Sequence, residues 1–287
     1  MSEPILAPPD PQHVRADVLR ALTEDVGTGD ISAQLLPNQP RLAQLIAREP
    51  GVLAGSAWFS ACFAELDSHA IVRWSRDEGQ AFVANDTICT VQADVRALLS
   101  GERSALNFLQ TLSATATATA AFVAALDGTS TRVLDTRKTL PGLRHAQKYA
   151  VRAGGGCNHR IGLYDAAMIK ENHVLAAGSI AAAIAAARSG AHGLPIIVEV
   201  ESLDELTQAL SCSPERIVLD DFTLADMRSA VERVSGRVPL EVSGGIDLST
   251  ARAIAETGVD FISVGAITKH VRAIDFSLRL IPADTLP

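Results

Sequence analysis

The spacing of apolar residues in the first part of the chain mixes two patterns. Over residues 95–126, leucines recur every three or four positions, which predicts one long helix with a single buried face. Shorter helical patterns occupy residues 11–22 and part of residues 51–66. Runs typical of strands, separated by turn residues, lie at residues 43–47, 70–74, 80–83 and 87–92. This part of the chain is therefore expected to combine helices with short strands.

The pattern changes after residue 128, where six short apolar runs alternate with helical segments. The predicted strands are residues 132–135, 167–170, 196–200, 217–220, 240–242 and 261–264. The predicted helices are residues 142–153, 179–189, 203–210, 224–234 and 250–257. Continuous apolar strands that alternate with helices predict parallel βα units with both faces of the sheet covered.

Such a sheet can stay open and doubly wound, or it can curve into a barrel. No G-x-G-x-x-G motif follows a predicted strand, which disfavours a dinucleotide-binding sheet. Loops containing Ser243-Gly244-Gly245 and Gly265 follow the last two strands, as in barrels that hold a phosphate with main-chain N–H groups. The segment is too short for eight units, which need roughly 250 residues. We expect an α/β protein with an incomplete (β/α) barrel of six or seven parallel strands.

Composition narrows the class of protein. Hydrophobic residues make up 47% and charged residues 20% of the 287 residues, which indicates a globular chain. Lys and Arg number 25 against 33 Asp and Glu, and aromatic residues are only 4%, so a general nucleic-acid binder is disfavoured. The four cysteines lie far apart and form no C-x-x-C pair, which argues against a zinc module or a disulfide scaffold.

Targeting signals are not evident in the sequence. Residues 1–12 are proline-rich and acidic, with no basic segment followed by an apolar stretch, which argues against a signal peptide. The apolar run at residues 174–187 is interrupted by Gly178 and Ser179 and is too short to span a bilayer. We therefore expect a cytoplasmic protein that contacts no membrane.

Charged residues follow the predicted strands where an active site of a barrel would lie. Thr136, Arg137 and Lys138 follow the first strand, Lys170 ends the second, and Glu199 and Asp220 end the next two. Residues 132–173 contain eight Lys or Arg and three Asp or Glu, although the chain as a whole carries a net charge of −8. An acidic protein with one basic section is expected to bind an anion there. A solvated basic helix would explain only Arg144, Lys148 and Arg152.

Two further features fit an anion site. Three glycines at residues 154–156 precede Asn158, His159 and Arg160, so the main chain can approach a ligand there, although a flexible linker is the alternative. Glu199 and Asp220 could hold hydroxyl groups or Mg²⁺, or could instead cap the helices that follow them. The residues alone do not name the reaction.

Several segments in order resemble the quinolinate phosphoribosyltransferase family. They are residues 24–30 (Glu-Asp-Val-Gly-Thr-Gly-Asp), 101–107 (Gly-Glu-Arg-Ser-Ala-Leu-Asn), 135–144 (Asp-Thr-Arg-Lys-Thr-Leu-Pro-Gly-Leu-Arg), 155–160 (Gly-Gly-Cys-Asn-His-Arg), 170–173 (Lys-Glu-Asn-His), 199–201 (Glu-Val-Glu) and 243–246 (Ser-Gly-Gly-Ile). Each segment alone is weakly specific, but together they cover nearly the whole chain.

The resemblance implies an organisation and a reaction. An N-terminal α/β sandwich domain (residues 1–114, joined by residues 272–287) would accompany a barrel domain of residues 115–271. Two copies would form a homodimer in which one sandwich domain covers the barrel of the other. The enzyme would transfer phosphoribose from phosphoribosyl pyrophosphate to quinolinate, with loss of pyrophosphate and CO₂, on the de novo NAD route.

The resemblance also implies roles for residues. Arg103 of the partner subunit would join Arg137, Lys138, His159, Arg160 and Lys170 in the anion site, and Thr136 lies in the same motif. Glu199 and Asp220 would face the ribose and Mg²⁺, and Ser243, Gly244, Gly245 and Gly265 would hold the 5′-phosphate. Lys138, Glu199 and Asp220 are the expected catalytic residues. Lys269 or its neighbour His270 would add a basic group, unless it is only a surface charge.

Three other functions are alternatives to this one. A transferase of the same fold that acts on nicotinate or another ring acid would need fewer cations than Arg103, Arg137, Arg160, Lys138 and Lys170 supply. A non-catalytic anion-binding relative would not need Glu199 and Asp220. A nucleic-acid binder is disfavoured by the net charge of −8.

Overall fold

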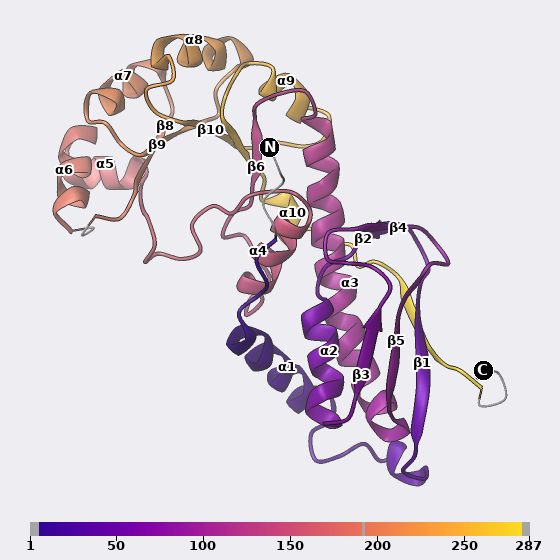
Figure 1. Ribbon diagram of the computed structural model, residues 1–287. Coiled ribbons are helices and arrows are strands. Elements are labelled where there is room, and N and C mark those ends of the chain that lie inside the picture. The colour runs from indigo at the N-terminus through magenta and orange to yellow at the C-terminus, as the bar shows by residue number, and fades with distance from the viewer. Residues whose placement is uncertain (1–5, 191–192, 283–287) are drawn as a thin grey trace. The chain divides into compact units, whose positions relative to one another are not determined.

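The structure is a computed structural model that describes residues 6–190 and 193–282 (Figure 1). The chain forms two compact units. Of the described residues, the first unit takes 6–120, 140–155 and 270–282, and the second takes 121–139, 156–190 and 193–269.

The first unit is built on an antiparallel sheet with the strand order β12-β1-β5-β3. These strands are β12 (Phe276–Leu280), β1 (Pro40–Ala47), β5 (Thr87–Asp94) and β3 (Ile71–Trp74). A smaller antiparallel pair joins β2 (Gly51–Val52) to β4 (Ala81–Phe82). The last strand, which the sequence pattern did not predict, pairs with β1 from Ala47↔Phe276 to Ala43↔Leu280.

Four helices accompany this sheet: α1 (Pro11–Asp25), α2 (Ser56–Leu66), most of α3 (Val95–Ala125) and α4 (Arg144–Ala153), with a single 3₁₀ turn at Ala33–Leu35. The Asp10 carboxylate caps α1 by accepting the Gln12 N–H at 2.8 Å. Fully buried side chains fill the core between the sheet and the helices, among them Trp58, Phe59, Leu109 and Leu112.

Among the described residues one helix, α3, is long and apolar enough to cross a membrane by length and composition. Half of its most apolar stretch is buried, and Leu98, Leu109 and Leu112 belong to the core of the first unit, as in a core helix. The predicted long helix is confirmed, including the Ala/Thr run at residues 113–121.

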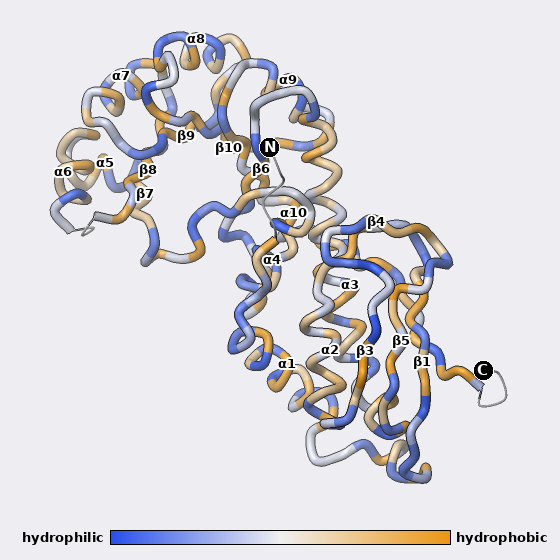
Figure 2. The backbone as a smooth tube through the Cα atoms, in the orientation of Figure 1, coloured by the Kyte–Doolittle hydropathy of each residue, from blue (hydrophilic) through white to orange (hydrophobic). Residues whose placement is uncertain are grey.

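The second unit carries six parallel strands in the order β6-β11-β10-β9-β8-β7. They are β6 (Arg132–Leu134), β11 (Phe261–Ser263), β10 (Leu240–Ser243), β9 (Arg216–Asp220), β8 (Ile196–Val200) and β7 (Ala167–Ile169). Each predicted strand is confirmed to within a residue or two. Figure 2 shows hydrophobic residues along these strands and hydrophilic residues in the loops between the elements.

The barrel is incomplete between β6 and β7, the two edges of this sheet. A closed barrel would pair these strands, which are consecutive in the chain. Instead Cys157 makes a single parallel bridge to Leu134 of β6, in which its N–H donates to the Val133 carbonyl at 2.8 Å and its carbonyl accepts the Asp135 N–H at 3.1 Å. This one-residue bridge stands where a further strand would lie, and the expected incomplete barrel is confirmed.

Most helices of the second unit follow the outer side of the curved row of strands (Figure 1). They are α5 (Glu171–Ala177), α6 (Ile180–Gly190), α7 (Leu203–Ser211), α8 (Leu224–Val234), α9 (Ala251–Ala255) and α10 (Ala266–Lys269). Helix α5 was not predicted, because Gly178 divides the apolar run at residues 174–187. This glycine has φ +88°, a left-handed conformation that ends α5 before α6 begins.

Candidate active site at the carboxyl ends of the strands

The loop that contains His159 and Arg160 is anchored to the end of β6 by a buried carboxylate. Asp135 is fully buried and accepts the His159 main-chain N–H at 2.8 Å and the Asn158 amide at 2.6 Å. Together with the bridge at Cys157, these bonds hold the end of the glycine-rich segment beside β6. From Cys157 onward the segment is therefore an ordered part of the barrel rather than a flexible linker.

Lys138 is held between the ends of β6 and β11. Its main-chain N–H donates to the Thr136 hydroxyl at 3.0 Å, and its carbonyl accepts the Thr268 hydroxyl at 2.9 Å. A Cβ atom on Gly265 would stand 2.9 Å from Cδ of Lys138, so a larger residue there would displace that side chain. Gly265, more than 120 positions later in the sequence, is therefore a neighbour of Thr136 and Lys138, and Lys138 stays exposed.

Two guanidinium groups lie close together at the same rim. Burial lowers the pKa of Arg160, the positive charge of Arg137 lowers it further, and Asp165 partly opposes both. Arg160 is oriented by a bond from its Nη1 to the Ala166 carbonyl at 3.1 Å. Because like charges repel, an anion placed between Arg137 and Arg160 would be stabilised by both.

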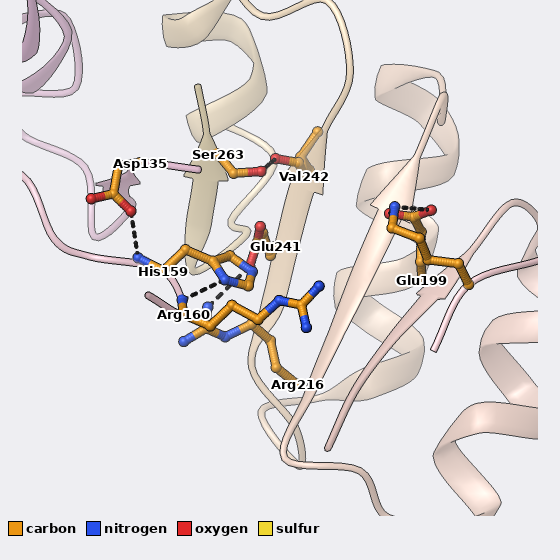
Figure 3. A network of polar contacts seen from close by, with 9 residues as sticks. Asp135, His159, Arg160, Glu199, Arg216, Glu241, Val242 and Ser263 are labelled. Carbon is orange, nitrogen blue, oxygen red and sulfur yellow. Dashed lines mark hydrogen bonds and ion pairs between the residues drawn. The ribbon is translucent and has the colours of Figure 1, made fainter. Parts of the chain in front are cut away.

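An ion pair joins the ends of β7 and β8. The Lys170 ammonium lies 2.7 Å from Oε1 and 2.6 Å from Oε2 of Glu199, as Figure 3 shows for the labelled Glu199. Glu199 is buried, whereas the Lys170 side chain is 42% exposed. The lysine can therefore turn toward solvent or a ligand, but the carboxylate is held in place.

Asp220 ends β9 and shares an electrostatic environment with both lysines. Burial raises the pKa of Asp220, as does the negative charge of Asp221, whereas Lys170 and Lys138 lower it. These effects place Lys138 of the β6 loop and Lys170 of β7 within range of one carboxylate on β9. The structure thus brings together the charged strand ends that the sequence singled out.

A cavity of about 400 Å³ opens beside this cluster, lined among others by Asp221, Ser243, Gly244, Gly245, Ser249 and Thr250. Gly244 has φ +97° and Gly245 φ +56°, in the left-handed region that favours glycine. A Cβ on Gly244 would stand 3.0 Å from Oδ1 of Asp221. The two glycines thus let the main chain turn tightly against the β9 loop and line one side of this cavity. Phe222, Leu224 and Met227 also line it and were not anticipated.

Other predicted residues take different positions. Arg103 lies on α3 in the first unit and is exposed. Lys269 is exposed at the end of α10, where its main-chain N–H donates to the Gly265 carbonyl at 3.1 Å. Lys269 belongs to the second unit and His270 to the first.

His159 does not lie at the rim. Its side chain is buried, Nδ1 accepts the Arg160 main-chain N–H at 2.6 Å, and Nε2 lies 3.4 Å from Oε2 of Glu241. Glu241 also pairs with Arg216, and neither residue was expected from the sequence. A glutamate inside the apolar run Leu240-Glu241-Val242 was the signal that could have revealed it.

The carboxylates at the strand ends could provide two ligands for Mg²⁺. Among residues 6–190 and 193–282, no group of three or more His, Cys, Asp or Glu side chains could hold a metal ion. Glu199 and Asp220 stand at the ends of adjacent strands, and Mg²⁺ commonly takes one or two carboxylates and completes its shell with water and substrate phosphates. These residues therefore fit a Mg²⁺ ion that arrives with a phosphorylated substrate.

The chain matches known proteins over nearly its whole length. Residues 30–113 match the N-terminal domain, and residues 115–279 the C-terminal domain, of quinolinate phosphoribosyl transferase. It is 43% identical over 275 residues to the nicotinate-nucleotide pyrophosphorylase [carboxylating] of Mycobacterium leprae, covering 93% of this chain and 96% of that protein. The probable enzyme of that name from Bacillus subtilis is 40% identical over 89% of each chain.

Its structure is similar to that of the nicotinate-nucleotide pyrophosphorylase from Francisella tularensis. The TM-score is 0.93 at 46% sequence identity, and the match covers 98% of this chain and all of that one.

Proposed function

The chain belongs to the quinolinate phosphoribosyl transferase family, and we propose that it makes nicotinate mononucleotide from quinolinate. The phosphoribosyl group of phosphoribosyl pyrophosphate is transferred to the ring nitrogen of quinolinate, and pyrophosphate and CO₂ leave. This places the enzyme in de novo NAD synthesis. The observation that carries the proposal is the set of cations at the strand ends. The positive charges of Lys138 and Lys170 both lower the pKa of Asp220, so the two lysines lie near the same carboxylate.

Quinolinate carries two adjacent carboxylates, and the rim offers cations for both. Arg137 and Arg160 repel one another in the free protein. A carboxylate bound between them would offset this repulsion with its negative charge. A guanidinium can donate two parallel hydrogen bonds to a carboxylate, which fixes the ring as well as binding it. Lys170, half exposed beside Glu199, is placed to turn toward the second carboxylate.

We assign the phosphoribosyl group to the part of the rim formed by the loops after β10 and β11. Ser243, Gly244 and Gly245, with Gly265 in the loop after β11, hold the 5′-phosphate through main-chain N–H groups. Glu199 and Asp220 face the ribose. Thr136 supports the Lys138 loop through its hydroxyl, and exposed Lys269 is a further candidate for an anionic group of the substrate.

Glu199 and Asp220 are also the residues that would hold Mg²⁺, which when bound would offset the negative charge of the pyrophosphate group. The raised pKa of Asp220 is consistent with a carboxylate that lacks sufficient positive charge in the free protein. Binding of a cation would favour its ionised form.

Catalysis consists of positioning and charge stabilisation, without a covalent nucleophile on the protein. As the bond to pyrophosphate breaks, positive charge grows on the ribose carbon, and the carboxylates of Glu199 and Asp220 stabilise it. Lys138, fixed by Thr268 and Gly265, stabilises the negative charge of the departing group. The carboxylate next to the substituted nitrogen then leaves as CO₂. The electron pair of the broken bond stays on the ring carbon, where the adjacent positive nitrogen stabilises it, and a proton from water completes the product.

We further propose that the enzyme is a cytoplasmic homodimer with shared sites, in which Arg103 of the partner subunit completes the anion site. Mixing Arg103→Ala protomers with Lys138→Ala protomers is expected to recover activity, because each heterodimer rebuilds one intact site. Activity no higher than that of either parent would contradict the shared site. Each variant alone, taken through the same mixing procedure, is the control.

The direct test is a pyrophosphate-release assay with phosphoribosyl pyrophosphate and Mg²⁺, comparing quinolinate with nicotinate. We expect release with quinolinate together with one CO₂ per pyrophosphate, and little release with nicotinate. Release with nicotinate alone would move the assignment to a transferase for a monocarboxylate. Binding of quinolinate without release would indicate a non-catalytic anion-binding protein.

A further inference from the structure

The interior of the barrel contains a polar group that the proposed reaction does not use. Glu241 on β10 is 1% exposed, and it pairs in register with Val218 of β9, whose side chain packs with Ala166 and Ile197. Neighbours in register on parallel strands point to the same side of the sheet, so Glu241 faces the interior with Val218. A buried carboxylate in such a place is costly unless its partners are well arranged.

Both partners of Glu241 reach the same oxygen. Arg216 Nη1 lies 3.0 Å from Oε2, and His159 Nε2 lies 3.4 Å from Oε2 (Figure 3). The Arg216 guanidinium also lies over the Phe261 ring, 4.6 Å from its centre. Burial alone would raise the pKa of Glu241, but the hydrogen bonds from His159 and Ser263 and the positive charge of Arg216 outweigh it, so the pKa lies below its ordinary value of 4.5. The carboxylate is therefore an acceptor for both neighbours.

The hydrogen bonds of His159 determine where its ring proton lies. The Arg160 main-chain N–H can only donate, and it points at Nδ1 from 2.6 Å, so Nδ1 must offer its lone pair. The proton then lies on Nε2, which faces the Glu241 carboxylate. Because Arg216 already balances the charge of Glu241, the imidazole can stay neutral. His159 is thus held in a single tautomer by partners inside the chain.

We propose that Glu241 is a positioning residue for quinolinate binding, acting through His159 on Arg160. By keeping the ring proton on Nε2, Glu241 makes Nδ1 the acceptor that fixes the Arg160 main chain. That bond, with the anchor of Asp135 on the His159 N–H, sets the direction in which the Arg160 guanidinium leaves the loop. The inference rests on the proposed function, in which Arg160 binds a carboxylate of quinolinate.

The proposal differs from a direct role for His159. A histidine that binds substrate or exchanges protons with it would present a ring nitrogen to the cavity, and its variants would change kcat. A ring whose two nitrogens are bonded to Arg160 and Glu241 should act on affinity instead. The two roles therefore separate in the ratio of KM to kcat and in the position of the ring proton.

The first arm of the test reads the tautomer directly in the wild-type protein. The ring nitrogens of ¹⁵N-histidine-labelled protein are observed by NMR, and the His159 signals are identified by their loss in His159→Gln. We expect, near neutral pH, an unprotonated Nδ1 and a protonated Nε2. Protonation of Nδ1, alone or together with Nε2, would overturn the proposal, whatever the activity of the enzyme.

The second arm compares two variants of Glu241. Glu241→Leu removes the acceptor, and the dissociation constant and KM for quinolinate are expected to rise roughly tenfold, with the KM for phosphoribosyl pyrophosphate changed less than about twofold. Glu241→Gln should recover most of this loss, because its amide oxygen can take the place of Oε2 and its NH₂ can donate to Ser263. If Glu241→Leu does not fold, Glu241→Asp, which withdraws the carboxylate by one methylene, takes its place.

Asp260→Ala is the matched control. Asp260 accepts the Leu240 N–H at 2.8 Å, so this bond supports the first residue of the same strand without a contact to His159. It should leave the affinity for quinolinate unchanged. An equal rise in this control, or no rise in Glu241→Leu, would overturn the proposal. If the wild type binds quinolinate but releases no pyrophosphate, the proposed function fails while the dissociation constants and the NMR arm still decide the positioning role.

Discussion

The second unit holds two groups of charged residues that differ in how they are enclosed. At the rim, Lys170 bonds both oxygens of Glu199 but remains 42% exposed. In the interior, Glu241 is 1% exposed and His159 8%. A half-exposed lysine can exchange its partner for a ligand at little cost, because water solvates it during the change. Buried partners cannot do so, and their value lies in holding a fixed geometry.

The comparison teaches that charge at a strand end and charge inside a strand serve different purposes in this barrel. Lys138, Lys170 and Asp220 interact across three separate strand ends, but their balance is incomplete, since the pKa of Asp220 stays raised. The interior set is balanced, since the pKa of Glu241 is lowered in spite of its burial. An unbalanced rim is suited to receive charged substrates and a cation, whereas a balanced interior is suited to hold the rim in place.

The largest effect expected at the rim is that of Lys138→Ala. We expect kcat to fall by about 10²–10³-fold, because one preorganised charge that stabilises the departing group is lost. The free energy of unfolding should change by less than about 0.5 kcal/mol, because the side chain is exposed. Steady-state kinetics and urea denaturation measure the two quantities.

The control for Lys138→Ala is Arg132→Ala, at the exposed start of β6, the strand that leads into the loop of Lys138. It removes a positive charge without touching the rim and should leave kcat unaltered. A kcat of Lys138→Ala within a factor of two of the wild type would remove Lys138 from the mechanism.

The next effect concerns stability and separates the two groups directly. Glu241→Leu should lower the free energy of unfolding by about 3–5 kcal/mol, because it leaves Arg216 and the His159 Nε2–H without their buried acceptor. Glu199→Leu should cost about 1 kcal/mol or less, because the exposed Lys170 regains water. Equal losses in the two variants, measured by chemical denaturation, would erase the proposed distinction.

A smaller effect of opposite sign is expected for Asp220→Asn. Its carboxyl has a raised pKa, so the ionised form is penalised in the folded state at neutral pH. Replacing it by a neutral amide should raise Tm slightly while it lowers activity. Differential scanning calorimetry without ligands would show the change, and a lower Tm would mean that the Asp220 charge is stabilising after all.

The smallest effect is the pH dependence carried by Glu241. A carboxyl whose pKa is lowered on folding contributes stability that is present above its ordinary pKa of 4.5 and is lost as pH falls toward its folded value. The wild type should therefore lose stability more steeply below about pH 4.5 than Glu241→Gln, which has no such group. Parallel slopes in denaturation series between pH 3 and 6 would contradict the assigned direction.

Much of the fold could be predicted because its signals are local. Each parallel strand is a short apolar run, and both faces of such strands are buried, so the run itself marks the strand. Helix α5 was missed because a single glycine in a left-handed conformation divides one apolar stretch into two helices. Strand β12 was missed because its five residues gain their strand character from pairing with β1, which lies more than 200 positions earlier.

The candidate site was predictable for the same local reason, up to a point. Charges that directly follow apolar strands, as at Lys138, Lys170 and Asp220, indicate the rim of a barrel wherever the strands are recognised. Their mutual positions could not be predicted. The bond between Lys170 and Glu199 joins residues 29 positions apart, and it depends on the register of β7 and β8.

The sequence by itself determined the alternation of strands and helices, the basic section, the glycine loops and, through its motifs, the family. Only the tertiary structure decided which polar groups meet. His159 turns away from the rim because Glu241, 82 positions later, accepts a hydrogen bond from its Nε2–H in the interior. Glu241 can be buried there because Arg216 on the neighbouring strand balances its charge. Such pairings arise from strand register and burial, which no short stretch of sequence encodes.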